Sequence, residues 1–183
     1  MLRYGLSLAA AWVVLDHATK WWIRDWVMNP PRIIPITDFF NLVLGYNTGV
    51  SFGVLGGTNL PPWVLSLVAF VIAAGLTVWL ARAGGRLVAT ALGLLIGGAL
   101  ANGTDRLIHG AVTDFLDFHL AGWHWPAFNM ADVGVVCGAG LLMLDSLVHP
   151  SGHPVERAAT PDQRVSKGVQ FPQRGTAQAK DKT

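Results

Sequence analysis

The rest of the chain is organised around Gly97–Asp132, which reads GGALANGTDRLIHGAVTDFLDFHLAGWHWPAFNMAD. It holds one arginine, two asparagines and four carboxylates, and apolar runs flank it on both sides; the carboxylates are Asp105, Asp114, Asp117 and Asp132. Polar groups at the edge of a membrane span are costly unless they are paired, so they are candidates for a functional site. Asp114 and Asp132 suit acid/base work on a bond brought to the membrane surface.

Composition indicates an integral membrane protein. Hydrophobic residues make up 52% of the 183 residues and charged residues 13%, against roughly 25% charged in soluble domains. The net charge is +2 and the basic residues are scattered, which argues against nucleic acid as a partner. A single cysteine, Cys137, excludes an internal disulfide framework and a Cys-rich metal site. Its apolar surroundings predict a small buried side chain.

Four apolar segments predict an all-α integral membrane fold of four transmembrane helices, at about 4–23, 62–80, 87–106 and 130–148. About twenty residues cross ~30 Å of hydrocarbon. For the first segment a cleaved signal peptide is the alternative, because Arg3 precedes the apolar run. The run continues beyond Ala11 and closes on Trp21 and Trp22 like an interfacial belt, which favours a span.

Charged residues inside these segments predict local pairs. Asp16 and Lys20 are four residues apart, with the acid first, so they share one helical face and can form an ion pair. Asn102, Asp105 and Arg106 crowd one sector of the third segment, and we expect Asp105 to pair with Arg106.

The segment at about 24–57 is not a span, because Pro30, Pro31 and Pro35 break helix. The run FFNLVLGYNTGVSFGVL predicts one or two short strands with a turn at residues 47–49, hence a small extracytoplasmic β-sheet element. From Pro150 onward the composition predicts a disordered tail. The expected organisation is a four-span membrane domain, 1–149, and a disordered basic cytoplasmic tail, 150–183.

An alternating four-span topology places both termini on one side of the membrane and the polar motifs on the other. The motif residues meeting there are Asp16, Lys20, Asn102, Asp105, Arg106, Asp114 and Asp132, which predicts one composite site. Six tryptophans suited to an interfacial belt fall on that same side: Trp21, Trp22, Trp26, Trp63, Trp123 and Trp125. The lysine and arginine bias of the connecting segments predicts that the termini are cytoplasmic and that the site faces outward.

The sequence Asn129-Met130-Ala131-Asp132 resembles a capping box at the start of the fourth segment, which is a sufficient structural role for both end residues. The helix dipole there stabilises a charged acid. Asp114 lies among apolar neighbours, where desolvation would raise its pKa. If the two meet, they can share one proton, as aspartic proteases do. We hypothesise that Asp132 is the more ionised, although the titration of such a pair does not divide cleanly by residue.

Three other readings stay open. A divalent metal could bind among five candidate ligands, although no spaced ligand pair is present: Asp114, Asp117, His119, His124 and Asp132. Ser51 or Cys137 could act as a nucleophile, but neither has an evident base in a matching motif. An ion-coupled carrier is the non-enzymatic alternative. Its acids would be expected along a path across the bilayer, whereas these gather at one face.

Five motifs occur in order: Asp16-His17-Ala18-Thr19-Lys20, Asn47-Thr48-Gly49-Val50-Ser51-Phe52, Gly97–Asn102 with Asp105-Arg106, Val112-Thr113-Asp114-Phe115, and Phe128–Asp132. Together they make the chain resemble prolipoprotein signal peptidase, the bacterial signal peptidase II family. Ser51 stands where alanine is more usual in that family, and the tail is an addition.

The resemblance implies an aspartic endopeptidase of the bacterial cytoplasmic (inner) membrane, active at the outer face, with no cofactor and no metal. Its partners would be membrane lipids and diacylglyceryl-modified prolipoproteins, cut just before the lipidated cysteine by a monomeric enzyme. By resemblance Asp114 and Asp132 are the catalytic dyad. Four residues would support or contact the substrate backbone, namely Asn47, Asn102, Arg106 and Asn129. Three would brace the site, namely Asp16, Lys20 and Asp105.

Overall fold

The structure is a computed structural model that describes residues 1–49 and 61–148. Its four long helices are α1 (Leu2–Trp22), α2 (Pro62–Arg82), α3 (Arg86–His109) and α4 (Met130–Val148), and each begins and ends within three residues of the predicted range. The end of the predicted β segment, 50–57, and the predicted tail, 150–183, lie outside the described residues.

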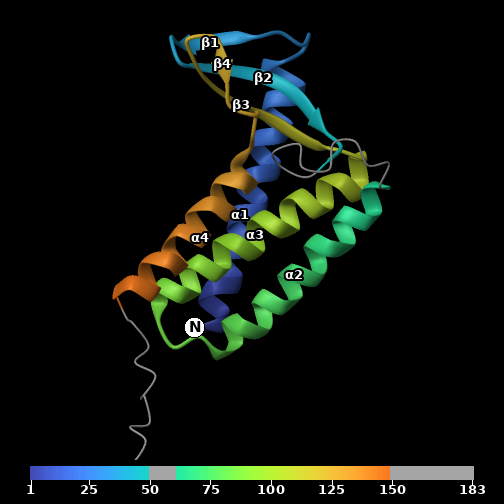
Figure 1. Cartoon of the computed structure of the whole chain (residues 1–183). Helices are drawn as coiled ribbons and strands as arrows, with labels where there is room; N and C mark the ends of the chain where they lie inside the picture. The colour runs from blue at the N-terminus through green and yellow to red at the C-terminus, as the bar shows by residue number, and fades with distance from the viewer. Residues whose placement is uncertain (50–60, 149–183) are drawn as a thin grey trace, which may run out of the picture. The chain divides into compact units, whose positions relative to one another are not determined.

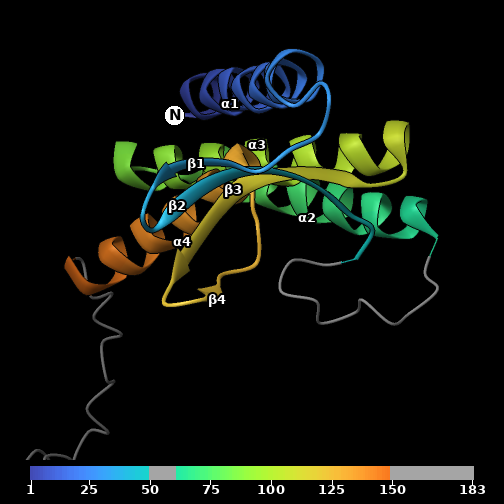
Figure 2. The same cartoon turned by 90° about the horizontal axis from the view of Figure 1, so that it is seen from above.

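Helix α3 lies at the centre of the helical part and packs against α1, α2 and α4 (Figures 1 and 2). Small residues permit this approach, as they do between membrane helices generally. A Cβ at Gly97 would lie 2.9 Å from the backbone oxygen of Ala9 on α1, and one at Gly138 of α4 would lie 2.7 Å from that of Ala91 on α3. Glycine is therefore required at both contacts.

Three of these helices, α2, α3 and α4, are long and apolar enough to cross a membrane. Helix α1 is as long as α2, at 21 residues. It is not among the helices in the described part of the chain that are both long and apolar enough to cross a membrane. It carries Arg3, Asp16 and Lys20, and the last two are buried inside the protein. The expectation of four spans is thus met for three helices.

An antiparallel sheet in the order β1-β2-β3-β4 lies at one end of the helices (Figure 1). Its strands are β1 (Ile34–Thr37), β2 (Phe40–Asn47), β3 (Val112–Leu120) and β4 (Trp123–His124). The sequence-based assignment to 24–57 was incomplete, because two strands come from the connection between α3 and α4. Part of that range is also not strand, since a π-helical turn, η1 (Ile23–Val27), extends α1.

A turn that the sequence did not predict joins β1 and β2. The turn between β1 and β2 is at Asp38 and Phe39, where the backbone N–H of Phe39 donates to Oγ1 of Thr37 at 3.3 Å. Asn47 ends β2, and its side-chain oxygen accepts from the backbone N–H of Gly49 at 3.0 Å. The strand expected after the predicted turn at 47–49 lies outside the described residues.

Two apolar clusters form the core, and the second joins the sheet to the end of the first helix. One, within the helical part, includes Leu80, Leu92 and Ile96. The other, formed by Ile23, Met28 and Phe115, joins η1 to β3. Between α3 and β3 the chain reverses at Gly110, whose φ of +75° is open to glycine without steric cost. The strand that carries Asp114, β3, therefore starts three residues after α3 ends.

Candidate active site

Asp114 is held on β3 by two neutral amides. Asn129 Nδ2 donates to its Oδ1 at 2.6 Å, and Asn47 Nδ2 donates to its Oδ2 at 3.2 Å. The carboxyl is buried. Asp114 lies in the sheet, opposite Gly45 of β2. Because Gly45 has no side chain, the space beside the carboxyl on that strand stays open.

Asp132 lies in the first turn of α4, and the predicted capping box is confirmed. The backbone N–H of Asp132 donates to Asn129 Oδ1 at 3.1 Å, and the backbone N–H of Asn129 donates to Asp132 Oδ2 at 3.2 Å. A third bond reaches the other oxygen, since Asn102 Nδ2 donates to Asp132 Oδ1 at 2.9 Å. Two N–H donors therefore hold the two oxygens of Asp132, and neither donor is a charged side chain.

Asn129 links the two acids. Its Nδ2 donates to Asp114 Oδ1, while its Oδ1 accepts from the backbone of Asp132. Both acids border one pocket of about 640 Å³, whose other lining residues are mostly apolar and come from β2, α4 and the 125–128 segment. The two acids therefore meet, as the sequence analysis predicted, and they do so at the edge of an apolar cavity that it did not predict.

The surroundings of Asp114 shift its titration. Burial raises its pKa, and the nearby charge of Asp132 raises it further, to about 6. Hydrogen bonds from Asn129 and Asn47 act in the opposite direction and are outweighed. Asp114 can therefore hold a proton close to neutral pH.

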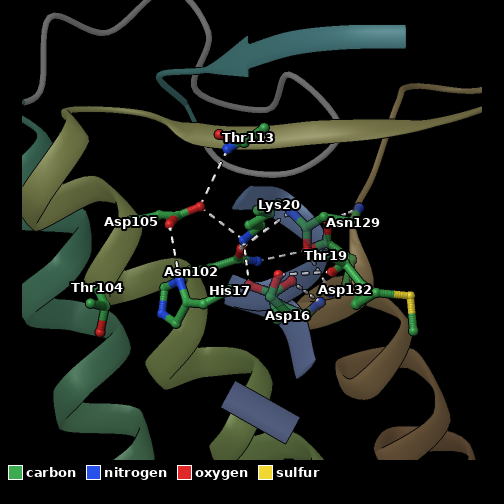
Figure 3. Close-up of polar contacts among 12 residues, drawn as sticks. Asp16, His17, Thr19, Lys20, Asn102, Thr104, Asp105, Thr113, Asn129 and Asp132 are labelled. Carbon is green, nitrogen blue, oxygen red and sulfur yellow. Dashed lines mark hydrogen bonds and ion pairs between the residues drawn. The ribbon is translucent and has the colours of Figure 1, made fainter. Parts of the chain in front are cut away.

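Beside Asp132 lies a charged cluster that joins three helices (Figure 3). Lys20 Nζ lies 2.7 Å from Asp16 Oδ2, which confirms the predicted ion pair, and 2.9 Å from Asp105 Oδ2. It also donates to Asn102 Oδ1 at 3.1 Å. The remaining oxygen of Asp16 accepts from the backbone N–H of Ala131 at 2.8 Å. These contacts tie α1 and α3 to the start of α4.

The predicted pair between Asp105 and Arg106 is wrong. Successive residues on a helix point about 100° apart, so Asp105 faces Lys20, with His17 Nδ1 3.5 Å from its second oxygen. Arg106 turns elsewhere and donates to the backbone oxygen of Gly49 at 2.7 Å and to that of Asn102 at 3.3 Å. It thereby fixes the end of β2.

That contact orients Asn47. Gly49, held by Arg106, donates its N–H to Asn47 Oδ1, which leaves Nδ2 of the same amide to donate to Asp114. The structure therefore brings every predicted site residue into one connected network: Asp16, Lys20, Asn47, Asn102, Asp105, Arg106, Asp114, Asn129 and Asp132.

The candidate metal ligands do not converge in the described part of the chain, where no three His, Cys, Asp or Glu side chains form a group that could hold an ion. Asp117 and His124 instead pair with each other, 2.9 Å apart. Burial acts to raise the pKa of Asp117, but the hydrogen bonds from Asn41 and His124 outweigh burial and hold that pKa below its usual range.

Sequence reasoning missed several features of the pocket. Trp125 and Phe128 line it, but nothing in their spacing pointed to a wall. The expectation that Cys137 is buried was wrong, since it is exposed on α4 and lines the same pocket. An apolar neighbourhood in a membrane helix faces lipid as readily as protein, so apolarity alone could not distinguish the two.

Comparison with known proteins gives the family. The sequence model of the family described as Signal peptidase (SPase) II matches residues 8–148. A lipoprotein signal peptidase of Methylorubrum extorquens (strain PA1) is 44% identical over 87% of this chain and 92% of its own length. Another, from Paraburkholderia phytofirmans (strain DSM 17436 / LMG 22146 / PsJN), is 49% identical over 78% of this chain and 83% of its own.

A solved structure of a bacterial membrane enzyme superposes with a TM-score of 0.71 at 26% identity, and covers 83% of this chain and 92% of its own. The matched range includes the capping box, the charged cluster and both carboxyls of the pocket. The chain therefore belongs to the signal peptidase II family, the lipoprotein signal peptidases, which remove the signal peptide from prolipoproteins during lipoprotein maturation.

Proposed function

We propose that the chain is an aspartic endopeptidase that cuts diacylglyceryl-modified prolipoproteins just before the lipidated cysteine, with Asp114 and Asp132 as its catalytic dyad. The observation that carries the proposal is their shared setting. Two carboxyls from different elements are joined through one asparagine at the edge of an apolar pocket of about 640 Å³.

In the proposed reaction, ionised Asp132 takes a proton from water and the resulting hydroxide attacks the scissile carbonyl carbon. Protonated Asp114 gives its proton to the carbonyl oxygen, which yields a tetrahedral diol. Asp132 then returns its proton to the amide nitrogen as the C–N bond breaks, and Asp114 recovers a proton from the diol. Each carboxyl ends as it began, as in other carboxyl pairs that share a proton.

The polar neighbours keep this pair in place. Asn129 and Asn102 hold the carboxylate oxygens with neutral donors, so neither acid is locked by a cation. Asn47 and Arg106 fix the end of β2 beside Asp114, where they could also contact the backbone of the substrate. The buried cluster of Asp16, Lys20 and Asp105 braces the helices beneath.

The pocket suits a lipidated substrate that arrives sideways through the bilayer. Its α4 wall is apolar and includes Val133, Val136 and Cys137. Val136 is exposed, so this wall continues onto the outer surface of the helix. Acyl chains and an apolar signal helix can therefore approach within the membrane, while water reaches the carboxyls from the sheet side.

We further propose that α1 is the fourth span. Its two inner charges, Asp16 and Lys20, are buried and paired, which removes most of the cost of placing them in hydrocarbon. Val14 and Leu15 are exposed and can face lipid. With four spans, the lysine and arginine bias supports cytoplasmic termini and a site at the outer face of the bacterial cytoplasmic membrane.

The test is cleavage of a lipidated prolipoprotein by Asp114→Asn and Asp132→Asn variants in detergent or liposomes, each checked for normal insertion. Loss of a general acid or base predicts a fall of about a thousandfold or more in kcat for each. Full activity of either variant would remove that residue from the dyad. Activity that survives strong chelators would support an aspartic mechanism over a metal-dependent one.

A further inference from the structure

A short segment separates two cavities beside the sheet. Trp125 and Phe128 line the catalytic pocket, of about 640 Å³, and also border a second, aromatic pocket of about 430 Å³ together with Phe118 and Leu120. We call residues 125–128 the wall. With open space on both sides, packing restrains the wall less than it restrains a core segment, so its position depends on specific anchors.

One end of the wall is anchored by backbone pairing. The Phe128 oxygen accepts from the N–H groups of Phe115 and Leu116 at 3.0 and 2.9 Å, and Phe128 donates back to Leu116 at 3.0 Å. This end leads straight into Asn129 and the capping box. The position of the two acids is therefore fixed independently of the other end of the wall.

The other end is anchored through the side chain that precedes it. His124 Nδ1 lies 2.9 and 3.0 Å from the two oxygens of Asp117, while the Trp125 N–H donates to the Phe118 oxygen at 2.8 Å. Asn41, directly across the sheet, donates to Asp117 Oδ2 at 2.9 Å. The His119 ring stacks on His124 with centroids 4.9 Å apart.

Asp117 is only 6% exposed, so its charge depends on these partners. A buried carboxylate is costly without hydrogen bonds, and this one is supplied by Asn41 from one strand and by His124 from the end of β4. Neither partner contacts Asp114 or Asp132. The dyad does not use this second acid of β3, and nothing in the proposed chemistry requires it.

We propose that Asp117 is a positioning residue, which through His124 sets the wall of the catalytic pocket and so determines how tightly the apolar part of the prolipoprotein binds. The proposal rests on the proposed function of that pocket. Since the dyad is anchored separately, a change at Asp117 alters substrate fit more than the chemical step. The expected signature is therefore a change in KM with kcat nearly unchanged.

The test measures kcat and KM for a lipidated prolipoprotein with Asp117→Ala, His124→Ala and the double variant. Removing one partner of a charged hydrogen bond predicts a rise in KM of about three- to tenfold, with kcat within about twofold. The double variant should be no worse than the worse single variant, because both remove one contact. His124→Asn keeps an N–H donor at a similar position and should restore KM to within about twofold of the unchanged enzyme.

The matched control is Asp25→Ala, which breaks an exposed ion pair with Arg24 of 3.1 Å and should leave KM unchanged. If Asp117→Ala does not fold, His124→Ala carries the test, since the His124 side chain is 53% exposed. An unchanged KM in that variant, additive effects in the double variant, or a fall in kcat alone would overturn the proposal. Active Asp114→Asn would instead overturn the dyad, so the two failures are distinguishable.

Discussion

Two sets of acids meet at the same end of the helices and differ in what holds them. Asp16 and Asp105 share a cation, with Lys20 Nζ 2.7 and 2.9 Å away. Asp114 and Asp132 are held by asparagine amides, and in the described part of the chain no ion pair reaches either. The ion pairs hold Asp16 and Asp105 in place and give them a structural role. Asp114, held by neutral donors beside a second acid, can change its protonation near neutral pH, which is what acid/base work requires.

The largest change in the free energy of unfolding is expected when the charged cluster of Asp16, Lys20 and Asp105 is broken. Lys20→Met leaves Asp16 and Asp105 buried without their cation, and removing one partner of a buried ion pair costs about 3–5 kcal/mol. We expect thermal unfolding in detergent to show that loss of stability. Adding Asp16→Asn and Asp105→Asn should recover part of it. A loss below about 1 kcal/mol for Lys20→Met would mean that the cluster does not brace the helices.

Replacing an acid of the dyad is expected to raise the free energy of unfolding at neutral pH, whereas breaking the charged cluster lowers it. Burial and Asp132 raise the pKa of Asp114 to about 6 from 3.8, so wild-type stability falls as pH rises between these values and stays lower above them. That fall is at most about 3 kcal/mol. Asp114→Asn removes this pH dependence of stability. The stability of the variant relative to wild type should therefore be greater at pH 8 than at pH 4, although the variant is inactive. Equal pH dependence of unfolding in the two proteins would contradict this.

A smaller effect, on the pH dependence of activity, is expected when the side-chain amide of Asn47 is removed. Asn47 donates to Asp114 and lowers its pKa, so Asn47→Ala should raise that pKa by about one unit or less. If Asp114 must be protonated, kcat/KM of the wild type falls as pH rises through about 6, and this alkaline limb should move to higher pH in the variant. A limb that moves to lower pH would reverse the assigned roles.

The smallest effect is expected at the pocket wall on α4. Cys137 lines the pocket, is exposed and is the sole cysteine of the chain. A methylthio group attached there should raise KM by about fourfold or less, because it takes space equivalent to one or two substrate carbons. The same reagent should leave a Cys137→Ser enzyme unchanged. An undiminished affinity in the labelled wild type would place the substrate elsewhere.

The sequence was sufficient where chemistry depends on local spacing. The Asp16–Lys20 pair follows from a spacing of four on a helix, and the Asn129–Asp132 capping box from a spacing of three. It was insufficient where partners are distant. The strand that carries Asp114 pairs with β2 about seventy residues earlier, and no periodicity within 112–120 reveals such a partner. The Arg106 contact with Gly49 was missed for the same reason.

The contrast between the two sets of acids is tested most directly by cleavage rate per folded molecule in Asp105→Asn and Asp114→Asn, measured side by side on one lipidated prolipoprotein. Both substitutions are isosteric and both remove one buried carboxylate. We predict that Asp105→Asn lowers the folded yield but keeps the rate per folded molecule within about tenfold, whereas Asp114→Asn loses about a thousandfold or more with its folded yield intact. Comparable rates for the two folded variants would contradict the assignment of Asp114 to the chemistry.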